Sequence, residues 1–273
     1  MTQYSRVETR AALLDIKGLD LWFGGTHAID NVDMSVEKGE ILGVIGPNGA
    51  GKSSALNCIN GFYRPQAGSV QFRGHELTTI RPHSIATMGI ARTFQNIELS
   101  PGETVMQNVM VGRHIHMRTG VVREMIWIGP GRREESRHRA HVEDIVCSLG
   151  LGAFLNRPVA DLPYGKQKLV ELARSLAMEP ELLLLDEPTA GMTREERAEV
   201  AVQIRRLKTE TGLTQVLIEH DAGFIRSLCD RVVVLDHGAV IASGSATEVM
   251  ADPKVVEAYL GVEPEDVEET DHQ

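Results

Sequence analysis

The sequence has no long apolar run and few cysteines, and both shortages restrict where the protein can work. No apolar run in the 273 residues approaches the ~18 that suggest a membrane-spanning helix. The polar N-terminus also lacks the apolar core of a signal peptide. Cys58, Cys147 and Cys229 lie far apart among apolar residues, which favours reduced thiols in or near the core. We therefore expect a protein that is made and kept in the cytosol.

Positive charge is also in short supply. The 28 Lys and Arg residues are outnumbered by 38 Asp and Glu residues, so the formal net charge is −10. A duplex-binding protein usually carries a basic face, so we expect no nucleic-acid partner. Residues 132–149 mix charges of both signs, which is typical of a solvated helix face. The Asn-Lys-x-Asp motif of guanine recognition is absent as well, which argues against a GTPase.

What the chain does have is an alternation of strand patterns with helical patterns. Hydrophobic residues make up 42% of the sequence, which is enough for a sizeable core. Apolar runs at residues 40–45, 182–186 and 215–219 are typical of buried parallel strands. The alternating residues 29–36 indicate a half-buried antiparallel strand, and residues 13–21 predict an edge strand. Together these patterns predict an α/β fold with a mostly parallel sheet.

Three further segments complete the predicted organisation. Residues 231–235 and 239–243 predict a β-hairpin around the turn Asp236-His237-Gly238. Residues 104–178 carry helical patterns, so a helical block is inserted between the strands. The chain from residue 263 onward is acidic, a composition typical of a disordered tail.

The most informative motif is the run Gly46-Pro47-Asn48-Gly49-Ala50-Gly51-Lys52-Ser53. It lies between a predicted strand and a predicted helix, which is the context in which a Gly-x-x-x-x-Gly-Lys-Ser sequence binds phosphate. Glycines allow backbone N–H groups to turn toward a phosphate, and the helix N-terminus favours negative charge there. We expect Lys52 to reach the β- and γ-phosphates and the Ser53 hydroxyl to contact Mg²⁺.

Two carboxylates close the apolar run at residues 182–186. Asp186 is predicted at the carboxyl end of a parallel strand, where ligands bind in open α/β sheets, so it is a candidate for Mg²⁺. Glu187 is a candidate to polarise a water for attack on the γ-phosphate, and such base catalysis typically contributes about 10²–10⁴-fold. The structural alternative is a helix-capping pair. His220 and Gln95 have the same ambiguity, because each has an ordinary structural explanation.

A second candidate anion site lies in Asp161-Leu162-Pro163-Tyr164-Gly165-Lys166-Gln167. This glycine-bearing loop precedes a helix predicted over residues 168–178, and a helix N-terminus favours anions. One chain rarely needs two such sites for one nucleotide. Two copies arranged head to tail would use both.

These motifs resemble, in order and spacing, those of the nucleotide-binding subunits of ATP-binding-cassette (ABC) transporters. Residues 46–53 resemble the Walker A loop of that family, and residues 182–186 resemble its Walker B strand. Residues 162–167 resemble its signature motif. The resemblance extends over residues 13–262, nearly the whole chain.

Four single residues extend the resemblance. Gln95 matches the Q-loop glutamine, Glu187 the catalytic glutamate and His220 the switch histidine of the family. Phe23 stands where the family places an aromatic ring that stacks on adenine. The resemblance therefore strengthens the two weaker candidates, Gln95 and His220.

The resemblance implies a single ABC ATPase domain over residues 13–262. Residues 13–95 and 179–262 would form a P-loop core with a mostly parallel sheet and an antiparallel β part. Residues 96–178 would form an inserted helical subdomain. The acidic tail covers residues 263–273.

The resemblance also implies the cofactors ATP and Mg²⁺ and a dimer with two ATP molecules at its interface. Each ATP would lie between the phosphate loop of one chain and the signature loop of the other. The resemblance assigns catalysis to Glu187, His220 and Lys52. It assigns the binding of Mg²⁺ to Ser53, Gln95 and Asp186. The residues assigned to the nucleotide are Phe23, Gly46, Pro47, Asn48, Gly49, Ala50, Gly51, Lys52, Ser53, Ser54, Gln95, Tyr164, Gly165, Lys166 and Gln167.

Departures from the family pattern narrow the resemblance to a subfamily. Pro163 and Tyr164 replace the usual serine and first glycine of the signature motif, so one hydroxyl contact to the γ-phosphate is missing. Thr193 stands where the family often has aspartate. These positions and several short motifs are similar to the ATPase subunits of branched-chain amino-acid importers. Relatives that import urea, amides or aromatic acids, and one lipopolysaccharide-export ATPase, share much of the pattern.

The resemblance implies a subunit that powers an importer at the inner face of the plasma membrane. Its partners would be transmembrane permease subunits, a second ATPase subunit of the same or a sister chain and, indirectly, a solute-binding protein. The expected permease-docking face is residues 96–178, and residues 103–108 are the first candidates within it. The alternative class is a soluble clamp on ribosomes or DNA. Such relatives typically carry two cassettes or a long coiled-coil insertion, and neither is present.

Overall fold

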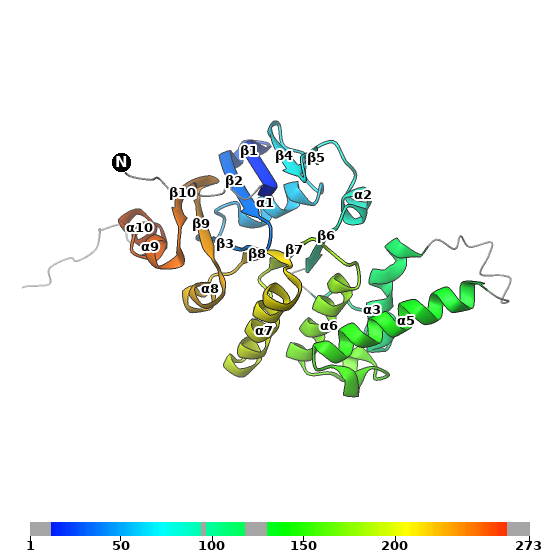
Figure 1. The fold of residues 1–273 in the computed structure, drawn as a ribbon. Coiled ribbons are helices and arrows are strands. Elements are labelled where there is room, and N and C mark those ends of the chain that lie inside the picture. The colour runs from blue at the N-terminus through cyan, green and yellow to red at the C-terminus, as the bar shows by residue number, and fades with distance from the viewer. Residues whose placement is uncertain (1–11, 94–96, 118–129, 261–273) are drawn as a thin grey trace, which may run out of the picture.

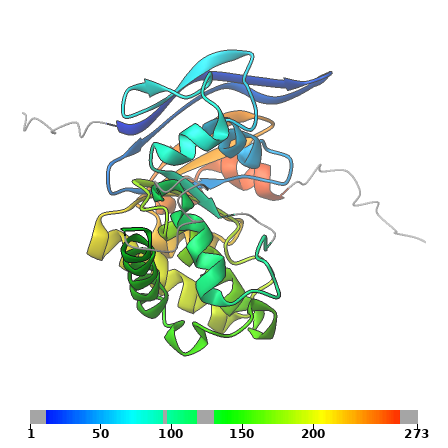
Figure 2. The same ribbon diagram turned by 90° about the vertical axis from the view of Figure 1, so that its right-hand side faces the viewer.

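A computed structural model describes residues 12–93, 97–117 and 130–260. Two β-sheets and a group of helices make up these residues (Figure 1). In Figure 2 the smaller sheet lies at the top and the group of helices at the bottom, with the larger sheet between them. None of the described helices is long and apolar enough to cross a membrane.

The larger sheet carries the predicted parallel core. Its strands are β3 Ile41–Ile45, β6 Ile90–Thr93, β7 Leu182–Asp186, β8 Thr214–Ile218, β9 Arg231–Asp236 and β10 Ala239–Gly244. They lie in the order β10-β9-β3-β8-β7-β6, and every pair except β10 with β9 is parallel. β3, β7 and β8 are buried along their whole length, as their continuous apolar runs predict. The antiparallel β9–β10 pair confirms the predicted hairpin.

The smaller sheet is antiparallel and shares a core with α1 and one face of the larger sheet. Its strands are β1 Ala12–Phe23, β2 Thr26–Glu37, β4 Ala67–Phe72 and β5 His75–Glu76, in the order β2-β1-β4-β5. β2 confirms the antiparallel strand predicted at residues 29–36. The edge strand predicted at residues 13–21 is wrong, because β1 lies inside the sheet. Its second neighbour, β4, follows only after the phosphate loop, so the local pattern of β1 cannot reveal it.

Helices cover both faces of the larger sheet. The first two are α1 Lys52–Ile59 and α2 Pro82–Thr87. The helical group contains α3 Val105–Arg113, η1 His114–His116, α5 Pro130–Ser148, η2 Gly152–Phe154, η3 Val159–Asp161 and α6 Tyr164–Leu176. The remainder are α7 Arg194–Arg206, the π-helical turn η4 Leu207–Thr211, α8 Ala222–Leu228, α9 Ala246–Met250 and α10 Pro253–Leu260.

The start of α6 differs from the prediction, which placed the helix at residues 168–178. The helix begins at Tyr164, directly after Pro163, whose φ of −55° suits a helix entry. Gly165 therefore lies in the first turn rather than in a loop. A Cβ at this position would lie 2.6 Å from Oε1 of Glu196, so a larger residue would have to displace that side chain.

Alternate residues of the larger sheet face two different cores. Leu182 and Leu184 of β7 belong to the core shared with α1 and the antiparallel sheet. Leu183 and Leu185 belong to the core shared with α3, α6 and α7. This division follows from the period of two along a strand. It places α1 and α6 against opposite faces of the sheet.

Candidate nucleotide site

Residues 46–51 form a loop that leaves the buried end of β3 and enters α1. Gly46 has a φ of 149°, and a Cβ there would lie 2.0 Å from the carbonyl oxygen of Leu235. Gly51 has a φ of 96°, and a Cβ there would lie 2.5 Å from the carbonyl oxygen of Ala28. Neither position has room for a side chain, so the loop is held closely against β9 and β2. This close packing gives the loop the fixed backbone that a phosphate site needs.

Lys52, the first residue of α1, folds back over the loop. Its Nζ donates to the carbonyl oxygens of Gly46 at 2.7 Å and Pro47 at 2.8 Å. Burial lowers the pKa of Lys52, and Glu187 and Asp186 act in the opposite direction. The amine therefore lies close enough to both carboxylates to feel their charge. Its two acceptors are carbonyl oxygens, which phosphate oxygens can replace.

Asp186 ends β7 and is held by an arginine from the neighbouring strand. Arg92 of β6 donates from Nη2 to Oδ2 of Asp186 at 2.6 Å and from Nη1 to Oδ1 of Asn57 at 2.6 Å. The side chains of Arg92 and Asp186 are only 9% and 4% exposed, so this is a buried ion pair. The arginine is a functional candidate that the sequence prediction missed. Its place one strand away from Asp186 depends on the sheet order.

The second carboxylate oxygen of Asp186 fits a metal ligand. Oδ1 is buried and has no hydrogen-bond partner among the described residues. A buried, unsatisfied carboxylate oxygen is costly, and a hard cation such as Mg²⁺ prefers oxygen ligands. The Ser53 hydroxyl, in the first turn of α1, is the other described candidate. The donor set of the described residues is therefore suitable for Mg²⁺.

Glu187 follows β7 in a strained conformation. Its φ of 45° is in the left-handed region, which costs a residue other than glycine about 1–3 kcal/mol. Its N–H donates to the carbonyl oxygen of Ile218 at 3.0 Å, which ties the end of β7 to the end of β8. Such strain persists only where the surroundings impose it. The backbone conformation of Glu187, the predicted catalytic residue, is thus fixed by its surroundings.

Glu219 connects the loop after Glu187 with His220. It is 1% exposed, and its Oε1 accepts the N–H of Thr189 at 3.0 Å and the hydroxyl of Thr189 at 2.6 Å. Its Oε2 lies 3.8 Å from Nδ1 of His220, whose side chain is 65% exposed. The sequence prediction passed over Glu219, although a carboxylate within an apolar strand end was a signal. His220 itself extends from the end of β8 toward solvent.

Phe23 and Gln95 were the remaining candidates on this half of the site. Phe23 ends β1, is 45% exposed and meets Tyr63 edge-on with ring centroids 4.9 Å apart. An exposed aromatic ring can stack on a base. Gln95 lies outside the described residues.

Tyr164, Gly165, Lys166 and Gln167 form the first turn of α6. The Gly165 N–H donates to Oε1 of Glu196 at 3.1 Å, and Lys166 pairs with Glu199 at 2.6 Å, so both contacts join α6 to α7. Gln167 Nε2 donates to the Leu162 carbonyl oxygen at 2.9 Å. The Glu196 pKa is lowered, first by the Thr193 N–H and also by the Gly165 N–H. The predicted second anion site therefore already holds a carboxylate of its own chain.

The helices that follow the two predicted anion sites lie on opposite faces of the larger sheet. α1 packs in the core shared with the antiparallel sheet, and α6 packs in the core shared with α3 and α7. Figure 1 places α6 with the helical group and α1 among the strands of the upper half. The structure therefore does not bring residues 164–167 to the phosphate loop of the same chain.

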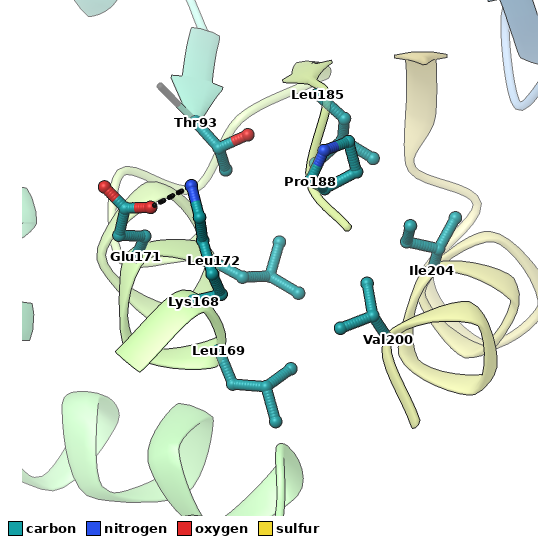
Figure 3. A pocket seen from close by; sticks show the side chains of 9 residues that line it. All are labelled: Thr93, Lys168, Leu169, Glu171, Leu172, Leu185, Pro188, Val200 and Ile204. Atoms are coloured by element: carbon teal, nitrogen blue, oxygen red, sulfur yellow. Dashed lines mark ion pairs between the residues drawn. The ribbon is translucent and has the colours of Figure 1, made fainter. Parts of the chain in front are cut away.

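A small cavity lies between α6, α7 and β7, behind the signature residues (Figure 3). Lys168 and Glu171 form an ion pair of 3.1 Å at its edge, with side chains 4% and 1% exposed. Oε1 of Glu171 also accepts the N–H of Glu98 at 3.0 Å. The other lining residues are mostly apolar. Glu171 thus joins α6 to the segment after β6, and no residue of the phosphate loop lines the cavity.

A phosphate loop, a buried carboxylate at the end of a parallel strand of the same sheet and a strained glutamate after it together define a P-loop ATPase. Comparison with protein families is more specific. The model of the "ABC transporter" family matches residues 29–190, and that of the "Branched-chain amino acid ATP-binding cassette transporter" family matches residues 239–265. The chain belongs to the ABC transporter family, as one of its ATP-hydrolysing cassettes. The predicted family and fold class are confirmed.

Individual relatives agree with this assignment. The chain is 36% identical over 249 residues to the high-affinity branched-chain amino acid transport ATP-binding protein BraF of Pseudomonas aeruginosa, covering 91% of this chain and 98% of that protein. LivG of Escherichia coli, described in the same words, has the same identity and coverage. A solved structure is that of MJ1267 in its ADP conformation, an ATP-binding cassette of an ABC transporter. It aligns with a TM-score of 0.81 and 31% identity, over 92% of this chain and 100% of that one.

Proposed function

We propose that this chain hydrolyses ATP to power an ABC importer for branched-chain or other hydrophobic amino acids. The observation that supports the ATPase role most strongly is the placement of Lys52 on the phosphate loop beside Asp186 and Glu187. The substrate class is proposed from the relatives that transport branched-chain amino acids and from the family model at residues 239–265.

In this proposal the phosphates of ATP are bound on residues 46–54, by the backbone N–H groups from Asn48 onward and by the amine of Lys52. Bound Mg²⁺ would neutralise charge on the β- and γ-phosphates. Ser53, Asp186 and Gln95 would hold it, and Arg92 would keep Asp186 oriented. Phe23 would stack on the adenine ring.

Glu187 would accept a proton from the attacking water, and His220 would contact the γ-phosphate. Glu219, through Thr189, would keep the two loops that carry these groups at a constant separation. Lys52 would stabilise the charge that develops on the transferred phosphoryl group. These roles need the fixed backbone of Glu187 and the buried position of Glu219 described above.

The composite site needs a second ATPase subunit, either an identical chain or a sister chain. Tyr164, Gly165, Lys166 and Gln167 of one subunit would contact the nucleotide on the phosphate loop of the other. Permease subunits would dock on residues 96–178, within a cassette that spans residues 13–262 and is followed by an acidic tail. A solute-binding protein would act indirectly, through the permease. The complex would place this chain at the inner face of the plasma membrane.

An uptake assay tests this function. Cells that lack the chain should lose most ATP-dependent uptake of radiolabelled leucine, and wild-type chain should restore it. Glu187→Gln should not restore uptake, whereas Glu195→Gln, which changes an exposed glutamate at the start of α7, should restore it fully. Unchanged leucine uptake in the cells that lack the chain would contradict the proposed substrate class. Full restoration by Glu187→Gln would contradict the proposed ATPase site.

A further inference from the structure

The C-terminal end of the described chain folds back onto the edge of the larger sheet. α9 begins with a capping box between Ser245 and Glu248. Val249 of α9 and Val255 of α10 are buried, at 3% and 2% exposure. Figure 1 shows both helices beside β10. α10 is therefore fixed beside β10, whose partner strand β9 packs against the phosphate loop.

One side chain of α10 reaches that loop. The hydroxyl oxygen of Tyr259 accepts the N–H of Gly46, the first glycine of the loop, at 2.8 Å. The carbonyl oxygen of the same glycine accepts Nζ of Lys52 at 2.7 Å. Gly46 is thus held on both sides of its backbone, by α10 at its N–H and by α1 at its carbonyl.

The turn between β9 and β10 holds the loop at a second point. The N–H of Gly238 donates to the carbonyl oxygen of Ala50 at 3.1 Å, and the carbonyl oxygen of Gly238 accepts the N–H of Asp30 at 2.9 Å. Both supports come from the part of the chain that follows residue 190, where the match to the general ABC transporter family ends. Tyr259 itself lies in the segment matched by the branched-chain family, residues 239–265.

We propose that Tyr259 is a positioning residue for the phosphate loop, so that the C-terminal segment sets the affinity of the chain for nucleotide phosphates. This inference rests on the nucleotide site proposed above. When Lys52 exchanges the Gly46 and Pro47 carbonyls for phosphate oxygens, it releases its hold on the start of the loop. The bond from the Gly46 N–H to Tyr259 does not involve phosphate and persists. It keeps Gly46 in place while the rest of the loop takes up the ligand.

Tyr259→Phe tests this proposal because it removes only the hydroxyl group. We expect the dissociation constant for ADP, measured by calorimetry on the full chain, to rise about threefold to tenfold, as the loss of one hydrogen bond implies. The affinity for adenosine, which has no phosphate, should not change. Hydrogen exchange of the peptide that covers residues 41–52 should become faster. The matched control is Val256→Ala, an exposed position on α10 that should behave as wild type in all three measurements.

Three results would overturn the proposal, and they are distinguishable. If Tyr259→Phe has the ADP affinity and the hydrogen-exchange rates of wild type, the hydroxyl does not position the loop. An equal loss of ADP and adenosine affinity, or an equal loss in Val256→Ala, would instead mean that α10 acts only through general packing. Finally, a wild-type chain that binds no ADP, or binds it as well as Lys52→Ala does, would overturn the nucleotide site itself.

Discussion

The phosphate-loop half and the signature half of the proposed site satisfy their polar groups in opposite ways. On the phosphate loop, an amine of the chain, Lys52, donates to loop carbonyl oxygens. On the first turn of α6, a carboxylate of the chain, Glu196, accepts from the Gly165 N–H. The carbonyl oxygens of the phosphate loop are therefore satisfied by a cationic side chain, and the Gly165 N–H of α6 by an anionic one.

The two halves of the site therefore lose different contacts when they bind phosphate. Phosphate oxygens can take over the Lys52 amine while the backbone N–H groups of the loop stay where they are. On α6, an incoming phosphate competes directly with Glu196 for an N–H group at a helix N-terminus. We therefore expect nucleotide to bind first at the phosphate loop, and the signature half to engage only when a second subunit brings the phosphate to it.

The largest effect is expected for Glu187→Gln. The amide cannot accept the proton of the attacking water, so steady-state ATP hydrolysis should fall by about 10²–10⁴-fold. Binding of ATP, measured by calorimetry, should remain close to that of wild type because the phosphate loop is untouched. Glu195→Gln serves as the control, with normal turnover expected. If Glu187→Gln hydrolysed ATP at a rate within a few-fold of wild type, Glu187 would not be the general base.

A large stability effect is expected for Arg92→Met. The substitution leaves Asp186 buried without its cationic partner, and breaking a buried ion pair in this way typically costs about 3–5 kcal/mol of unfolding free energy. Urea unfolding measures the loss. In a double-mutant cycle, Asp186→Asn should restore part of it, because the carboxylate charge that lost its arginine partner is then removed. Strictly additive losses would show that the two residues are not coupled.

The smallest effect is expected for Glu196→Gln, which tests whether the Glu196 carboxylate competes with phosphate for the first turn of α6. The neutral amide is a weaker acceptor for the Gly165 N–H, so the signature half should engage a phosphate more readily. In the Glu187→Gln background, ATP-dependent dimerisation should occur at about twofold to fivefold lower ATP concentration, the range expected for a charge at a helix end. Analytical ultracentrifugation measures the shift. A shift to higher ATP concentration would mean that Glu196 supports the signature turn rather than blocking it.

The same variant has a pH dependence that can be read independently of ATP. Hydrogen bonds from the Thr193 and Gly165 N–H groups lower the Glu196 pKa below its ordinary value of 4.5. The stabilisation is therefore present above that value and is lost as pH falls through the lowered pKa. We expect Glu196→Gln to be slightly less stable than wild type at neutral pH and equal to it in acid. A difference that grows in acid would have the wrong sign.

The elements that the sequence predicts correctly are those with a local signal. The continuous apolar runs predict β3, β7 and β8, and the glycine spacing predicts the loop before α1. Pairs that the fold brings together over long distances could not be predicted, among them Arg92 with Asp186, Glu219 with Thr189 and Tyr259 with Gly46. Each pair depends on strand order or on a helix that returns to the sheet. Gly165 misled the prediction of α6, because this glycine lies in the first turn of the helix, against Glu196, and not in a loop before it.

The most direct test of the central claim, that two subunits complete one site, is the mass of Glu187→Gln by light scattering at saturating ATP and Mg²⁺. It is measured on the chain alone and on its mixture with the ATPase that co-purifies with its permease. The account predicts that ATP raises the mass from the 30.0 kDa of one chain to that of a two-subunit particle in at least one sample. A chain that binds ATP yet keeps the mass of one subunit in both samples would contradict it.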